Sequence, residues 1–177
     1  MTEAPIPVTT EEDIRTEWRG TPIYDLLSYH NLKRPFQLHD RAELVITMCM
    51  DFRKSLRIPD RFAYVLRTGG GNPRGVEFEI SYAIAVGGAR SLALVAHDDC
   101  AMVGLHRRRD IYIQGLVLEG WSRDEAIAHF DSQSQARDLS NPGSFVRDEA
   151  RRLQTRYPNI TVAPLFYSVE DGMLYQL

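Results

Sequence analysis

Short apolar runs alternate with amphipathic stretches along the chain, and glycine, proline and asparagine stand at most of the boundaries. The runs "AELVITMC" and "SLALVAH" carry few polar residues, which is typical of strands that are buried on both faces of a parallel sheet. Two further stretches, "RFAYVLRT" and "ITVAPLFYSV", also read as strands. The predicted strands therefore cover residues 42–49, 61–68, 91–97 and 160–169.

Helical periodicity and helix caps occupy the segments between these strands. The start signals are an asparagine followed by proline, at 72–73 and 141–142, and a Ser-x-x-Glu capping box at 122–125. Further helical signals run through residues 11–32. Residues 1–10, which contain two prolines, read as a loose arm.

Strands that alternate with helices predict an α/β fold with a mainly parallel central β-sheet flanked by helices. An Asp-Gly turn at 171–172 predicts a closing hairpin, which adds a short C-terminal antiparallel edge strand. The segment 11–32 adds an N-terminal helical arm. Because no repeat and no linker interrupts the 177 residues, we predict one domain that spans residues 1–177.

Composition and charge narrow the range of functions. With 44% hydrophobic and 25% charged residues, the chain has the composition of a soluble globular protein. A net charge of -3 and a pI near 6.0 indicate no basic surface for nucleic acid, and no apolar run approaches the roughly 20 residues of a membrane span. The acidic start lacks the features of a secretory signal, so we expect a cytoplasmic protein.

The two cysteines and one of the histidines stand at the ends of predicted strands. Cys49 ends the first strand, His97 ends the third, and Cys100 follows three residues later. Ligands of open α/β sheets bind beyond the carboxyl ends of the strands, and two thiolates with one imidazole suit zinc. Three protein ligands leave a fourth position open, as in catalytic zinc sites. A redox pair of cysteines is the alternative, although it would not explain His97.

A run of three glycines follows the second predicted strand. Without side chains, Gly69 and Gly70 can bring bare backbone close to a substrate, and the alternative is a plain strand-to-helix turn. The run is not a phosphate-binding loop, because it lacks both the Lys-Ser/Thr of a P-loop and the G-x-G-x-x-G spacing.

Several of these stretches together resemble the β-class carbonic anhydrases, in particular a compact, prokaryotic-type member. "CMDFR" and "HDDC" are similar to the Cys-x-Asp-x-Arg and His-x-x-Cys motifs of that family, and "LRTGGGN" is similar to its Arg-Asn-Ala-Gly-Asn loop. The resemblance implies Zn²⁺ on Cys49, His97 and Cys100. It also implies that Asp51 pairs with Arg53 beside the metal and, when released from Arg53, binds the metal as a fourth ligand.

The activity that the resemblance implies is reversible hydration of carbon dioxide to bicarbonate by a zinc-bound hydroxide. Arg53 carries a permanent charge and a fork that can hold Asp51, which can then serve the zinc-bound water. The sequence departs from the family pattern at Asp98, Asp99 and Ala101. Two alternatives therefore stay open: hydrolysis of carbonyl sulfide or carbon disulfide, and a non-catalytic zinc protein that binds an anion or a partner.

The resemblance also implies a homodimer or a higher even oligomer. In such an assembly the sheets of two subunits pair, and residues 1–35 pack on the partner. Apolar residues in this segment, Ile14, Trp18, Ile23 and Leu26, lack an obvious core of their own in the sequence, which agrees with that arrangement.

Overall fold

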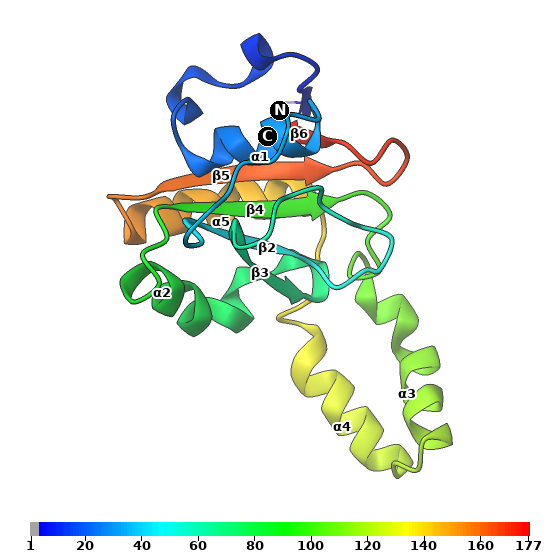
Figure 1. Cartoon of the computed structure of the whole chain (residues 1–177). Coiled ribbons are helices and arrows are strands. Elements are labelled where there is room, and N and C mark those ends of the chain that lie inside the picture. Colours follow the sequence, from blue (N-terminus) through cyan, green and yellow to red (C-terminus); the bar gives the residue numbers. More distant parts are fainter. Residues whose placement is uncertain (1–3) are drawn as a thin grey trace.

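The computed structural model describes residues 4–177 and has a six-stranded mixed sheet at its centre (Figure 1). Along the sheet the strands follow the order β1-β6-β5-β4-β2-β3. Strands β5, β4, β2 and β3 run parallel to one another, and β6 and β1 add antiparallel pairs at one edge. The strands are β1 Ile6–Pro7, β2 Leu44–Cys49, β3 Ala63–Thr68, β4 Ser91–His97, β5 Thr161–Tyr167 and β6 Leu174–Gln176.

The structure confirms the predicted α/β class and each predicted strand. Every residue of β2 and β4 is buried, because both strands lie inside the sheet and helices cover both of its faces. The edge strand β3 is half exposed. The Asp-Gly turn joins β5 to β6 as a hairpin, as the sequence predicts.

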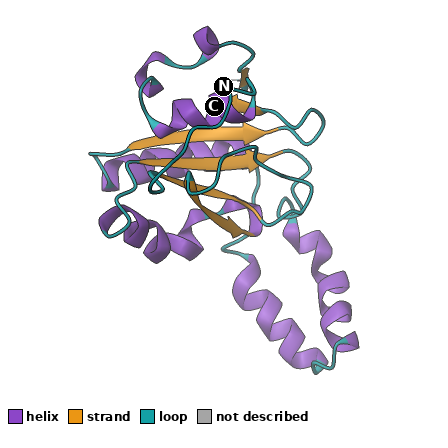
Figure 2. Ribbon diagram, viewed as in Figure 1, coloured by secondary structure: helices purple, strands orange, loops and turns teal. Residues whose placement is uncertain are grey.

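Helices pack on both faces of the sheet (Figure 2). The α-helices are α1 Pro22–His30, α2 Glu77–Ala85, α3 Arg109–Leu118, α4 Arg123–Ser134 and α5 Pro142–Arg156. Short 3₁₀ turns are η1 Glu11–Asp13, η2 Thr16–Trp18, η3 Gly69–Gly71, η4 Pro73–Val76 and η5 Leu105–Arg108. The three predicted start signals are confirmed: Asn72 and Asn141 accept hydrogen bonds from backbone N–H groups in their first turns, and Ser122 forms a capping box.

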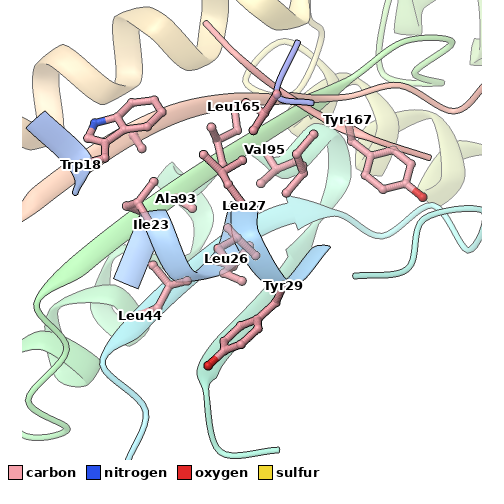
Figure 3. Close-up of a cluster of buried hydrophobic side chains, with 14 of the residues drawn as sticks. Trp18, Ile23, Leu26, Leu27, Tyr29, Leu44, Ala93, Val95, Leu165 and Tyr167 are labelled. Carbon is pink, nitrogen blue, oxygen red and sulfur yellow. The ribbon is translucent and has the colours of Figure 1, made fainter. Parts of the chain in front are cut away.

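Alternate residues of β4 supply two separate cores. Ala93 and Val95 face α1 and the N-terminal segment, and Figure 3 shows this cluster around Leu27 and Trp18. The alternate residues Leu92, Leu94 and Ala96 face α2 and α5 on the other side of the sheet. Burial of apolar side chains on both faces holds β2 and β4 rigidly, so their carboxyl ends form a fixed platform.

The N-terminal segment differs from the prediction in two respects. Part of the predicted loose arm forms β1, which pairs with β6, and residues 11–20 form the two 3₁₀ turns rather than a helix. Asn31 holds this segment in place: its amide donates to the carbonyls of Val8 and Leu174 and accepts from the N–H of Leu174.

The apolar residues of this segment pack within their own chain. Ile14, Trp18, Ile23 and Leu26 are all buried in the first core. The expectation that they lack a core was wrong, because η1, η2 and α1 fold back onto the sheet. These side chains therefore lend no support to packing of residues 1–35 on a partner, which stays a prediction.

The helices α3 and α4 form a hairpin that projects from the body of the molecule (Figure 1). Its base joins the body where Val103 and Leu139 form a bridge. No helix within residues 4–177 has the length and apolar character needed to cross a bilayer.

Candidate metal centre

The sheet brings the two cysteines and His97 together. Strands β2 and β4 are parallel neighbours, so Cys49 at the end of β2 and His97 at the end of β4 lie at the same edge. Cys100 lies in the turn after β4. All three residues are buried, and their ligand atoms lie within 4.8 Å of one another. Within residues 4–177 this is the one such cluster of His, Cys, Asp or Glu.

His97 is oriented as a metal ligand. Its Nδ1 lies 2.5 Å from the backbone carbonyl oxygen of Asp98, which can only accept, so Nδ1 carries the proton. The other nitrogen, Nε2, is therefore an acceptor; it is buried and has no hydrogen-bond partner in the structure. A buried acceptor without a partner is costly, and a metal ion between Nε2 and the two sulfurs would remove that cost. The donor set thus fits zinc.

The two thiols share their ionisation. The pKa of Cys49 is lowered, chiefly because the Cys100 thiol donates to its sulfur, and the backbone N–H of Gly70 adds to the effect. The pKa of Cys100 is raised, first by that hydrogen bond to Cys49 and then by burial. Without a metal ion the pair therefore favours one thiolate at Cys49, and a bound divalent cation is the natural means of stabilising two.

The glycine run supports the sulfur of Cys49. The backbone N–H of Gly70 donates to Sγ of Cys49 over 3.3 Å. Gly70 and Gly71 have φ values of 69° and 71°, which glycine adopts without strain. A Cβ on Gly71 would lie 2.9 Å from the carbonyl oxygen of Val95, so the loop can approach both strands only without a side chain. This support of the ligand is a role that the sequence did not reveal.

Asp51 and Arg53 form the expected pair in the loop after β2. The guanidinium of Arg53 donates from Nη2 to Oδ2 of Asp51 over 2.7 Å and from Nε to Oδ1 over 3.1 Å, and its backbone N–H donates to Oδ1 over 2.9 Å. These hydrogen bonds, with that of the side chain largest, hold the pKa of Asp51 well below its usual range. Asp51 is therefore a carboxylate that accepts hydrogen bonds beside the cluster.

Solved structures with the same arrangement of strands and helices are known. The chain superposes on a carbonic anhydrase from Glaciozyma antarctica with a TM-score of 0.63 and 20% identity, covering 92% of this chain and 99% of that one. For a β-carbonic anhydrase from Trichomonas vaginalis the TM-score is 0.64 with 16% identity, covering 82% and 88%. The chain has the fold of the β-carbonic anhydrases.

A carbon disulfide hydrolase shares the same fold, with a TM-score of 0.57, 18% identity and coverage of 94% of this chain and 91% of that one. No protein-family model and no curated protein matches the sequence. At these identities the likeness concerns the fold, and the chemistry has to be argued from the residues of this chain.

Lys54 is a charged residue close to the Cys49–His97–Cys100 cluster that the motifs did not include. It is only 2% exposed, and its Nζ lies 3.0 Å from Oδ2 of Asp51. That is an ion-pair distance, but among residues 4–177 Nζ has no hydrogen-bond partner of acceptable geometry, so the contact is a charge pair without an aligned hydrogen bond. In the sequence, the only indication of this pair is that Lys54 stands three residues after Asp51.

Arg67 of β3 fixes the loop that carries these charges. Its Nη1 donates to the carbonyls of Cys49 and Asp51, over 3.1 Å and 3.4 Å, and its Nη2 donates to the carbonyl of Lys54 over 2.9 Å. One side chain thus ties three carbonyls of the loop to the neighbouring strand. The conformation that presents Asp51 to the cluster follows from these bonds.

The two acids after His97 have separate roles. Asp98 accepts the backbone N–H of Val169 over 2.8 Å, which ties the end of β4 to the closing hairpin. Asp99 accepts from Nη1 of Arg53 over 2.7 Å, so its charge is paired. In the described part of the chain, neither carboxylate accepts a hydrogen bond from the backbone amides that directly follow it.

A hollow of about 560 Å³ opens beside His97 and Cys100. Its lining includes Asp99 and Arg108 as well as Phe166, so it presents charges of both signs and an apolar wall. The hollow is large enough for a small molecule to approach this side of the cluster.

Proposed function

We propose that the protein is a zinc enzyme that reversibly hydrates carbon dioxide to bicarbonate. The observation that carries the proposal is the buried Cys49–His97–Cys100 cluster with the partnerless Nε2 of His97, on a β-carbonic anhydrase fold. In this proposal the three residues hold Zn²⁺ and leave a fourth position open. A bound zinc ion supplies activation of water for attack on a small electrophilic carbon.

The residues around the cluster supply positioning and proton transfer. Arg53 holds Asp51 by its guanidinium and its backbone N–H, so a carboxylate oxygen is available to orient water and to accept its proton. Two thiolates formally neutralise a zinc ion, and such a site acidifies water less than one with neutral ligands, which makes an auxiliary base useful. The low pKa of Asp51 makes it a weak base, so we assign it the role of orienting the water and passing its proton on, with Arg53 as the residue that positions it.

The glycine run is proposed to border the substrate. Gly69 and Gly70 follow β3 directly, and the N–H of Gly70 already reaches Cys49. Met102 and Leu139 fill the space that side chains at Gly69 and Gly70 would take, so the proposed contact with a small linear substrate comes from the backbone of these glycines.

A second substrate class is favoured by one observation. A carbon disulfide hydrolase has the same fold over 94% of this chain, so hydrolysis of carbon disulfide or carbonyl sulfide is the alternative. Both molecules resemble carbon dioxide in shape, so the same residues would serve.

Elemental analysis and a paired assay test the proposal. Protein purified without chelator should carry about one zinc per chain, and Cys100→Ser should lose it. Stopped-flow hydration of carbon dioxide between about pH 7 and 9 and release of sulfide from carbon disulfide then separate the two substrates. Asp51→Asn should keep zinc and slow turnover by about 10²–10⁴-fold.

Two results would contradict the proposal. A metal-free wild type that is folded and active would exclude the zinc role. A zinc-loaded wild type that turns over neither substrate would contradict the enzymatic role and favour a non-catalytic zinc protein that binds an anion or a partner.

We also propose that the working unit is a homodimer or a larger even oligomer in the cytoplasm. The support is a stripe of exposed apolar residues along α2 and its C-cap, where Phe78, Tyr82 and Val86 are 75%, 57% and 67% exposed, together with Val65 on the edge strand β3. Light scattering should therefore find an even multiple of the 20.2 kDa chain mass. A lone 20.2 kDa particle at micromolar concentration would contradict this.

A further inference from the structure

Lys54 is a buried lysine that pairs with Asp51, although Arg53 already holds the same carboxylate. Within residues 4–177, Asp51 is the one carboxylate that forms an ion pair with its ammonium group. A buried ammonium is stable only when an opposite charge compensates for the lost hydration. Movement of Asp51 away from Lys54 would therefore deprive a buried cation of the one carboxylate paired with it, and that cost opposes the movement.

The contacts of Asp51 are divided between two independent cations. Oδ1 accepts from Nε and the backbone N–H of Arg53, and Oδ2 lies 2.7 Å from Nη2 of Arg53 and 3.0 Å from Nζ of Lys54. Truncation of Arg53 to alanine would remove the guanidinium, but the backbone N–H and the ammonium of Lys54 would remain. Each carboxylate oxygen would then still have one of its present contacts.

We infer that Lys54 is a second anchor for Asp51, a positioning residue that keeps the carboxylate from becoming a fourth metal ligand even when Arg53 is lost. The inference rests on the metal site of the proposed function. It changes the expected behaviour of the Arg53→Ala variant, because a single anchor would predict that this variant closes the site. With two anchors, closure requires that both side-chain charges are removed.

Cobalt(II) bound in place of zinc gives a direct readout of the ligands, because its visible absorption depends on ligand type and geometry. In each background the spectrum is compared with and without the additional change Asp51→Asn. That change removes a metal ligand, and so changes the coordination geometry that the band intensity reports, only where Asp51 binds the metal. We expect no difference in wild type, in Arg53→Ala or in Lys54→Met, and a clear difference in the Arg53→Ala/Lys54→Met double variant.

Titration with azide, followed in the same absorption bands, gives the magnitude. Occupation of the open position by Asp51 raises the apparent dissociation constant in inverse proportion to the fraction of open sites. We expect each single variant to stay within about threefold of wild type, and the double variant to rise at least about tenfold. Arg53→Ala/Lys54→Arg should retain the open spectrum, and Lys33→Met is the matched control for loss of a lysine elsewhere.

The outcomes separate this inference from the proposed function. The inference that Lys54 is a second anchor is overturned if Asp51→Asn changes the cobalt spectrum of Arg53→Ala alone. It is also overturned if Asp51→Asn leaves the cobalt spectrum of the double variant unchanged while the circular dichroism of the double variant matches that of wild type. If Lys54→Met does not fold, Lys54→Gln takes its place under the same criteria. A wild type that binds no cobalt through its thiolates overturns both proposals. The expected cobalt pattern in a protein without turnover supports the anchor and contradicts only the activity.

Discussion

Replacement of Gly71 by alanine should disturb the metal centre through the backbone. Gly71 lies where the glycine run crosses between β2 and β4, the two strands that carry Cys49 and His97. A Cβ at this position would lie 2.9 Å from the carbonyl oxygen of Val95 and 3.4 Å from the backbone nitrogen of Cys49. Both neighbours are main-chain atoms inside the sheet, so neither can swing away as a side chain could.

Two costs contribute to the expected effect. The φ of 71° is left-handed, and a non-glycine residue in that conformation costs roughly 1–2 kcal/mol. Forcing a methyl group into a packed site costs about 1–3 kcal/mol more. The total of about 2–5 kcal/mol is a large share of the roughly 5–15 kcal/mol that stabilises a typical domain. Displacement of the strand ends should also weaken metal binding.

Urea unfolding of the metal-free protein measures the loss of stability, and competition with a chelating dye measures the loss of metal affinity. With a slope near 2 kcal/mol per M, the unfolding midpoint should fall by about 1–2.5 M. Gly115→Ala is the matched control: Gly115 lies inside α3 with nothing within 4 Å of the added Cβ, so this change should stabilise by about 0.5–1 kcal/mol. A Gly71→Ala protein within about 0.5 kcal/mol of wild type would refute the reasoning.

Two further predictions concern buried polar groups. Burial raises the pKa of Glu149, but hydrogen bonds from Arg74 and Arg152 outweigh it and keep that pKa below its ordinary 4.5. The ionised Glu149 therefore stabilises the fold above about pH 4.5, and this stabilisation is lost as the pH falls further. In urea unfolding between about pH 6 and 3, Glu149→Gln should lose less stability with falling pH than wild type does. An unchanged dependence of the unfolding free energy on pH would contradict this prediction. Asn31→Ala leaves backbone groups of Val8 and β6 unpaired and should cost about 2–4 kcal/mol in thermal unfolding, whereas a loss below about 1 kcal/mol would show that water replaces the amide.

The parts of the fold that the sequence predicts are those fixed by local rules. The strands β2 and β4 are continuous apolar runs because both of their faces are covered, and the caps at Asn72, Ser122 and Asn141 use side chains within a few residues of the helix start. The cluster of Cys49, His97 and Cys100 followed from the same source. Once two strands are parallel neighbours, the residues at their carboxyl ends must lie at one edge.

The features that the sequence did not reveal depend on partners far along the chain. The N-terminal segment carries helical signals, but its course follows from pairing of β1 with β6 and from Asn31, whose hydrogen bonds reach Leu174. The adjacent acids Asp98 and Asp99 point to different partners, Val169 and Arg53, because the turn after β4 separates their side chains. Local capping rules could not assign either contact.

The burial of Lys54 depends on such a distant contact, and this bears on how the Cys-x-Asp-x-Arg motif works in this chain. In the sequence a lysine after the motif reads as a surface residue. Arg67, which lies on β3, binds the carbonyls of Cys49, Asp51 and Lys54 and so fixes the loop in which the ammonium faces Asp51. The carboxylate beside the cluster is therefore held by a motif residue and by a residue outside the motif. For that reason removal of Arg53 alone is a weaker perturbation of Asp51 than the motif suggests.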